Sequence, residues 1–123
     1  MPEFYTLRLK DNEEVIASIH KFMENKGIEL AMPIMAYGKI KNVELLTLGK
    51  NTTVFRDYSG NSYEVTAMSG KVHRNSEGYY TNIAVILNKS YATTAHGLLR
   101  KALADEFLEI KLRKINLRNI IEV

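Results

Sequence analysis

The side chains of this sequence that most readily bind metal ions or transfer protons are those of three histidines, His20, His73 and His96. A catalytic zinc ion needs three protein ligands, yet the sequence has no H-x-H pair, no H-E-x-x-H motif and no cysteine. It also has neither a G-x-S-x-G nucleophile elbow nor a phosphate-binding P-loop. The sequence therefore predicts no bound metal, no cofactor and no catalytic residue.

His96 has the most room of the three, because Thr93, Thr94, Ala95 and Gly97 beside it are small. Small neighbours leave space for a ligand at the histidine, or for another backbone to approach closely. In the second case the histidine would be hydrogen-bonded inside a tightly paired sheet. Both interpretations stay open, and the first places His96 and Thr94 in a pocket.

The chain is mildly basic, with 17 lysines and arginines against 14 aspartates and glutamates and a formal net charge of +3. Lys39 and Lys41 flank an isoleucine, and Lys111 and Arg113 share one face of a strand. These four side chains are candidates for phosphate contacts, although lysines on an edge strand also serve to prevent aggregation. With so modest a charge, we expect any DNA binding to be weak, salt-sensitive and tolerant of sequence.

The elements that must position these residues begin with a strand and a helix. Residues 4–10 alternate between apolar and polar side chains, which predicts a half-buried strand. Apolar residues then recur at helical spacing, with Asp11 and Glu14 spaced as a capping box and Gly27 as the C-terminal cap. We expect one main helix over about residues 12–26.

The following residues are typical of a sheet. Residues 79–87 are nearly all apolar or small, which indicates a central strand buried on both faces. Pro33 indicates an edge, a bend or a bulge, and Ser69-Gly70 predicts a break. Turn residues divide the earlier part into strands near residues 30–36, 39–48, 53–57 and 62–68.

The C-terminal third mixes two patterns. Residues 98–105 suit either an amphipathic helix or a strand, and both assignments stay open. Residues 106–114 alternate cleanly, which predicts a strand. Because short turns join antiparallel neighbours, we expect a single α+β domain over residues 1–123, a mostly antiparallel sheet with one main helix packed on one face.

Composition limits the class of protein. Apolar residues make up 46% and charged residues 25% of the chain, which is typical of a folded globular domain. The first residues lack the pattern of a signal peptide, and no apolar run approaches the ~20 residues needed to cross a bilayer. The absence of cysteine is compatible with a reducing compartment. We therefore expect a cytoplasmic protein without a membrane partner.

Two segments are more specific than the rest: Gly-x-x-x-Asn-Val at residues 38–43 and Glu-Val-x-x-x-Ser-Gly at residues 64–70. They follow a helix opened by Asn12-Glu13-Glu14-Val15 and precede an apolar strand and His96. In this order the chain resembles the plants-and-prokaryotes conserved (PPC) domain over almost its whole length. The resemblance implies an α+β fold and a homotrimer. In plants the domain accompanies AT-hook segments of nuclear DNA-binding proteins, and stand-alone prokaryotic members are often labelled DNA-binding-like.

The chain departs from this family at a metal site. Many prokaryotic members carry an H-x-H pair on the strand before the conserved histidine, and the three histidines can hold a metal. Here the pair falls on Thr81 and Ile83 or on Tyr80 and Asn82, so only His96 remains. The Arg-Gly-Arg-Pro core of an AT-hook is absent as well. Thr81 and Asn82 accordingly join His96 and Thr94 as residues of a possible pocket without a metal.

Two functions are compatible with these features. The leading hypothesis is a PPC-like assembly or binding module, a homotrimer with a nucleic-acid-associated or regulatory role, rather than an enzyme. The alternative is a small-molecule-binding protein or enzyme with a pocket around His96, since the fold also resembles that of acetolactate decarboxylase, a metal enzyme that uses histidines. Self-association has independent support, because one helix covers one face of the sheet and another copy can cover the second face of residues 79–87.

Overall fold

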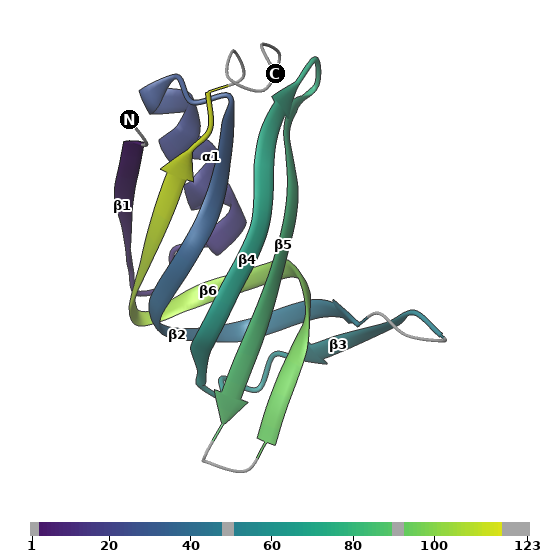
Figure 1. The fold of residues 1–123 in the computed structure, drawn as a ribbon. Helices are drawn as coiled ribbons and strands as arrows, with labels where there is room; N and C mark the ends of the chain where they lie inside the picture. The colour runs from purple at the N-terminus through teal and green to yellow at the C-terminus, as the bar shows by residue number, and fades with distance from the viewer. Residues whose placement is uncertain (1–2, 48–50, 90–92, 117–123) are drawn as a thin grey trace.

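One helix and six strands make up residues 3–47, 51–89 and 93–116, the part of the chain that the computed structural model describes (Figure 1). The strand pairings are antiparallel, so the expected α+β class with one main helix is confirmed. In chain order the elements are β1 (Glu3–Lys10), α1 (Val15–Lys26), β2 (Leu30–Thr47), β3 (Thr53–Asp57), β4 (Tyr63–Asn75), β5 (Gly78–Lys89) and β6 (Thr93–Lys114).

The six strands form one sheet in the order β1-β6-β5-β4-β2-β3, and β6 also pairs with β2. Because β2 pairs with both β4 and β6, and β5 joins β4 to β6, these four strands close into a ring. The long strands β2 and β6 pair along much of their length and bend together (Figure 1). The sheet therefore has an inner face, against which α1 packs, and an outer face.

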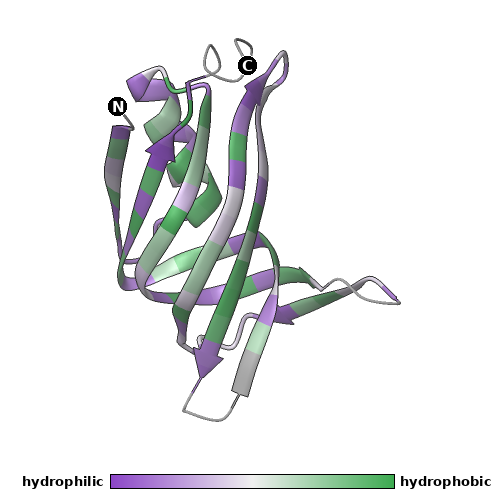
Figure 2. Ribbon diagram, in the orientation of Figure 1, coloured by the Kyte–Doolittle hydropathy of each residue, from purple (hydrophilic) through white to green (hydrophobic). Residues whose placement is uncertain are grey.

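Alternating side chains supply the core. Figure 2 shows this alternation as hydrophobic and hydrophilic bands along β1 and the last part of β6. On the inner face, Val15, Ile19 and Met23 of α1 and Leu108 and Ile110 of β6 are all fully buried. Burying a side chain of this size stabilises the fold by about 1.5–3 kcal/mol relative to leaving it exposed.

The ends of α1 match the prediction at the C-terminus and differ from it at the N-terminus. Gly27 ends the helix in the left-handed conformation, with φ of 66°. The N-cap is Glu14 rather than Asp11, and its Oε1 accepts a hydrogen bond from the Ala17 N–H at 2.9 Å. The capping-box assignment was wrong because the chain turns at Asn12, with φ of 71°, before the helix begins. No described helix has the length and apolar character needed to span a membrane.

Three segments that look irregular or ambiguous in the sequence are continuous strand. Residues 98–105 belong to β6 and not to a helix. The strand β4 runs through Ser69-Gly70, where the predicted break is wrong, because Gly70 admits the backbone of Asn82 on β5 at close range. The strand β2 continues through Pro33, and the register shift between Pro33 and Met35 agrees with the bulge that was one of the possibilities predicted there.

Within a single chain β5 is buried on one face only. Ile83, Val85 and Leu87 are fully buried, whereas Tyr80 is 51% and Ile86 44% exposed on the outer face. The prediction of burial on both faces is therefore wrong for the single chain, because α1 covers only the inner face. The outer face of β5 is left open to solvent or to a partner.

Candidate functional site

His96 lies on the outer face of the sheet near the start of β6, opposite Ile86 of β5 in the strand register. Next to it, a Cβ on Gly97 would lie 2.7 Å from the carbonyl oxygen of Leu46 on β2, so only glycine fits there. The exposed ring borders a concavity of about 280 Å³ with small or apolar walls that include Ala67, Ser69, Ala84, Ile86 and Leu98. The small residues around His96 thus leave open space at the ring and also admit the β2 backbone.

The structure separates the other residues of the expected pocket. Asn82 faces the outer side and borders an adjoining cavity of about 500 Å³, together with Met32 and Lys71. Thr81 points to the inner side, where its Oγ1 is hydrogen-bonded to Nε2 of His20 on α1. The side chain of Thr94 lies outside the described residues. Asn82 and His96 therefore share a face of the sheet, and Thr81 does not.

The family's histidine pair corresponds either to Thr81 and Ile83 or to Tyr80 and Asn82, and the pleat of β5 shows which of these pairs lies on the same face as His96. Tyr80 and Asn82 face outward, on the side of His96, whereas Ile83 is buried and Thr81 faces α1. Among the described residues, no group of three His, Cys, Asp or Glu side chains lies close enough together to hold a metal ion. The concavity offers a ligand one imidazole, the hydroxyl group of Ser69 and apolar walls.

His20 has a structural role that was not predicted from the sequence. Besides its hydrogen bond to Thr81, its ring stacks on Tyr79, with ring centroids 5.6 Å apart and ring planes inclined by 30°. Burial lowers the pKa of His20, and the nearby charge of Glu14 partly offsets this effect. The signal in the sequence is its spacing, since His20 follows Ile16 by four residues and so lies beside the apolar stripe of the helix.

The free energy of unfolding is expected to fall as the pH drops below about 6.5, the ordinary pKa of histidine. Because the pKa of His20 is lowered in the folded state, the unfolded chain binds more protons between the folded pKa and that value. Urea unfolding across this pH range measures the effect, and His20→Gln should flatten the profile. A profile that keeps its slope in this variant would assign the pH dependence to other groups.

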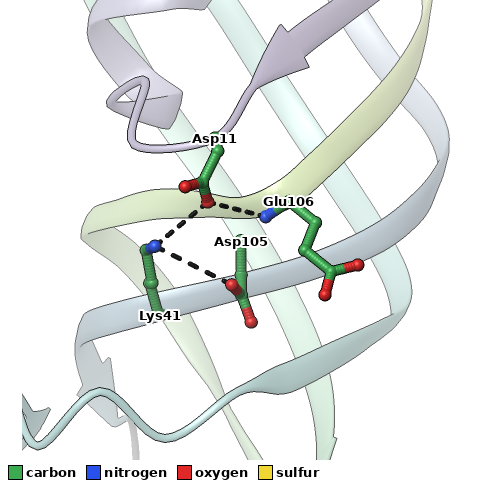
Figure 3. A network of polar contacts seen from close by, with 4 residues as sticks. All are labelled: Asp11, Lys41, Asp105 and Glu106. Carbon is green, nitrogen blue, oxygen red and sulfur yellow. Dashed lines mark hydrogen bonds and ion pairs between the residues drawn. The ribbon is translucent and has the colours of Figure 1, made fainter.

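Lys41, a candidate for phosphate contact, is held by carboxylates instead (Figure 3). Its Nζ lies 3.0 Å from Oδ1 of Asp11 and 3.8 Å from Oδ1 of Asp105, and its side chain is only 19% exposed. The same Asp11 oxygen accepts the backbone N–H of Glu106 at 2.7 Å, and this bond is the main cause of the lowered pKa of Asp11. Lys41 therefore joins β2 to β6 and to the turn after β1.

The other three phosphate candidates divide into two places. Lys39 is exposed but lies between Glu64 of β4 and Asp105 of β6 in the strand registers, beside negative charge. Lys111 and Arg113 lie on the outer face of β6, and neither forms an ion pair within the described residues. Of the four candidates, Lys111 and Arg113 are thus the pair placed to meet an anion.

Exposed rings on this outer face were missed by the sequence analysis. Phe4, Tyr37 and Phe107 are 49%, 67% and 45% exposed. Phe4 occupies an outward position of β1, on the opposite side from Tyr5 and Leu7. The alternation of β1 is the signal that places Phe4 outward, whereas the position of Tyr37 depends on the register shift in β2.

Comparison with known proteins agrees with the resemblance seen in the sequence. The model of the Plants and Prokaryotes Conserved (PCC) domain, the family abbreviated PPC above, matches residues 2–116. No curated protein sequence matches the chain.

Solved structures share the fold at low sequence identity. A plant- and prokaryote-conserved protein from Pyrococcus horikoshii is 24% identical, with a TM-score of 0.80, and the alignment covers 94% of this chain and 82% of that chain. A metal-containing protein from Archaeoglobus fulgidus is 23% identical, with a TM-score of 0.77 and coverage of 91% and 79%. A candidate DNA-binding protein from Bacteroides thetaiotaomicron is 18% identical, with a TM-score of 0.70 and coverage of 94% and 84%.

The similar structures show the fold, and the match to the family model shows the family. This match spans β1 to the end of β6, including the Gly-x-x-x-Asn-Val segment, Gly70 and His96. The chain therefore belongs to the Plants and Prokaryotes Conserved (PCC) domain family.

Proposed function

We propose that this protein is a self-assembling binding module that acts as a homotrimer in a nucleic-acid-associated or regulatory role. The observation that carries the proposal is an apolar area on the outer face of β4, β5 and the start of β6, which no other described residue of the chain covers. This area is called the assembly face below, and it comprises Ala67, Ala84, Ile86, His96 and Leu98.

The assembly face has the properties of a surface that pairs with another copy. Ile86 is a large apolar residue exposed beside Ala67 and Ala84, whose small side chains allow a second backbone to approach. The adjoining cavity with Met32 extends the apolar surface toward β2. A stable interface buries about 800 Å² per partner, and a trimer requires two different patches that meet around a threefold axis.

Light scattering at micromolar concentration should give the mass of a trimer, and Ile86→Asp should give a monomer. An aspartate on this face would be buried without a partner on assembly, at a cost of several kcal/mol. The matched control is Ala17→Asp, because Ala17 is also an exposed apolar residue but lies on α1, which packs on the inner face of the sheet. A monomeric wild-type protein would refute the proposal, and a dimer would refute the trimer while retaining the covered face.

The nucleic-acid-associated role rests on different residues. The description as a candidate DNA-binding protein belongs to the relative from Bacteroides thetaiotaomicron. In this chain the support is the position of Lys111 and Arg113, two exposed cations on one face of β6 that have no described carboxylate partner. Phosphate groups are a natural counterpart for such side chains.

A second candidate function is the binding of a small molecule at His96. The concavity of about 280 Å³ beside its ring favours this function, since ligand sites combine apolar walls with a few polar groups. A compound that raises the unfolding temperature of the wild-type protein but not of His96→Ala would support it. An equal response of both proteins would place the compound elsewhere.

A further inference from the structure

The outer face of β1, β6 and the first half of β2 is rich in cations. Its charged residues between Phe4 and Phe107 are Arg8 and Lys10 on β1, Lys111 and Arg113 on β6, and the carboxylate of Glu109. At the Tyr37 and Phe107 end, a neighbouring pocket adds Lys39 and the carboxylates of Glu64, Asp105 and Glu106, so the excess of cations lies toward Phe4. Glu109 is paired with Arg8 at 3.3 Å, so the charges of Lys111 and Arg113 are not balanced locally. We call this surface the basic face. It shares the long strand β6 with the assembly face, and it borders the adjoining cavity at Met32 of β2, which is opposite Arg113.

Aromatic rings stand among these cations. Lys111 Nζ lies 5.2 Å from the centroid of the Phe4 ring, and the rings of Tyr37 and Phe107 lie 5.7 Å apart. Since Phe4 is opposite Arg113, it is six positions from Phe107 along β6, or about 20 Å at the usual rise of a strand. Two exposed aromatic positions are thus separated by a cationic stretch on one face.

We propose that the basic face binds single-stranded nucleic acid. Bases would stack on Phe4 at one end and on Tyr37 and Phe107 at the other. Lys111, between these rings, and Arg113, opposite Phe4, would contact the phosphates. This inference deepens the proposed nucleic-acid-associated role and rests on it. Surfaces that bind single strands without sequence preference combine a positive track for the backbone with aromatic side chains for the bases.

The exposed rings favour a single strand over a duplex. In a duplex the bases already stack on each other, so Phe4 and Tyr37 would find no free base. Phosphate contacts alone would involve the cations and leave the rings in water. The described helix α1 could not enter a groove of a duplex from the basic face, because it packs on the inner face of the sheet.

The test is fluorescence anisotropy of the full chain with a labelled oligothymidine of a length within the ~4–16 nucleotides typical of such surfaces. A duplex of the same length is the comparison. We expect preference for the single strand, and about tenfold weaker binding for Phe4→Ala. Lys111→Gln should reduce the slope of log K against log salt by about 0.7.

Lys21→Gln is the matched control, because Lys21 is an exposed lysine on α1, remote from the basic face. It should leave the single-strand affinity near the wild-type value. Urea unfolding of Phe4→Ala checks that the variant is folded, and Lys111→Gln tests the same face without removing a ring.

Three results would overturn the inference, and they can be told apart from failure of the proposed role. Equal binding of duplex and single strand that is unaffected by Phe4→Ala would reject the stacking surface but keep the nucleic-acid association. Binding of neither form would reject both. Binding to phosphatidylserine vesicles with no binding to the oligonucleotide would also reject both and assign the basic face to an anionic membrane.

Discussion

Replacing Gly70 with alanine is expected to lower the free energy of unfolding by about 2–5 kcal/mol. Gly70 lies within β4 with φ of 122°, a conformation that is strained for residues with a Cβ atom. A Cβ at this position would lie 2.0 Å from the carbonyl oxygen of Asn82 on β5, so one of the two strands would have to move. The midpoint and slope of urea unfolding measure the loss.

Gly78→Ala is the matched control for this substitution. Gly78 has a similar φ of 130°, but no atom lies within 4 Å of the position that its Cβ would take. Replacing Gly78 with alanine therefore introduces the same kind of backbone strain without the collision. We expect the free energy of unfolding to fall by about 1–2 kcal/mol. Equal losses in the two variants would show that backbone conformation alone explains the effect at Gly70.

Replacing Glu14 with alanine is expected to cost about 2–4 kcal/mol of the free energy of unfolding. The carboxylate of Glu14 caps α1 through the Ala17 N–H at 2.9 Å, and its other oxygen accepts the Ala102 N–H of β6 at 3.0 Å. Because Ala102 is fully buried, its N–H group would lose its hydrogen bond in a place that water reaches poorly. Urea unfolding of the variant gives the change directly.

Glu24→Ala is the control, because it also removes a negative charge and shortens a glutamate side chain, but at an exposed position of α1. A change within about 0.5 kcal/mol is expected there. Glu14→Gln should lie between the two, since its amide keeps one acceptor oxygen for two donors. A loss at Glu14→Ala no larger than at Glu24→Ala would contradict the role of Glu14 in joining α1 to β6.

The helix and several strands were predictable because their signals are local. The C-terminal cap at Gly27 and the strand at residues 53–57 coincide with the structure. The N-cap was assigned wrongly to Asp11. The same sequence fits two arrangements, a capping box formed by Asp11 and Glu14 or a turn followed by a helix that Glu14 caps, and the structure has the second. The distinction depends on Asn12, whose N–H bonds to the carbonyl oxygen of Ala104 on a distant strand.

The candidate site was predictable only in part. Small residues around His96 indicated room beside the ring, and a concavity is present there. The assignment of Thr81 to the same pocket required the phase of the pleat in β5, which a nearly uniform apolar run does not reveal. Lys41 looked free because its partners Asp11 and Asp105 are distant in sequence and meet it only when β2, β6 and the turn after β1 come together.

The sequence by itself determined the family, the α+β class and the place of the helix, because these depend on residue order, hydrophobic periodicity and helix caps. The tertiary structure decided which residues meet across strands: Lys111 with Phe4, Tyr37 with Phe107, and Thr81 with His20. It also decided that β4 passes through Gly70 and that β6 continues through residues 98–105. The physical reason is that strand register is set by pairing between distant segments, and a shift of one residue moves a side chain to the opposite face of the sheet.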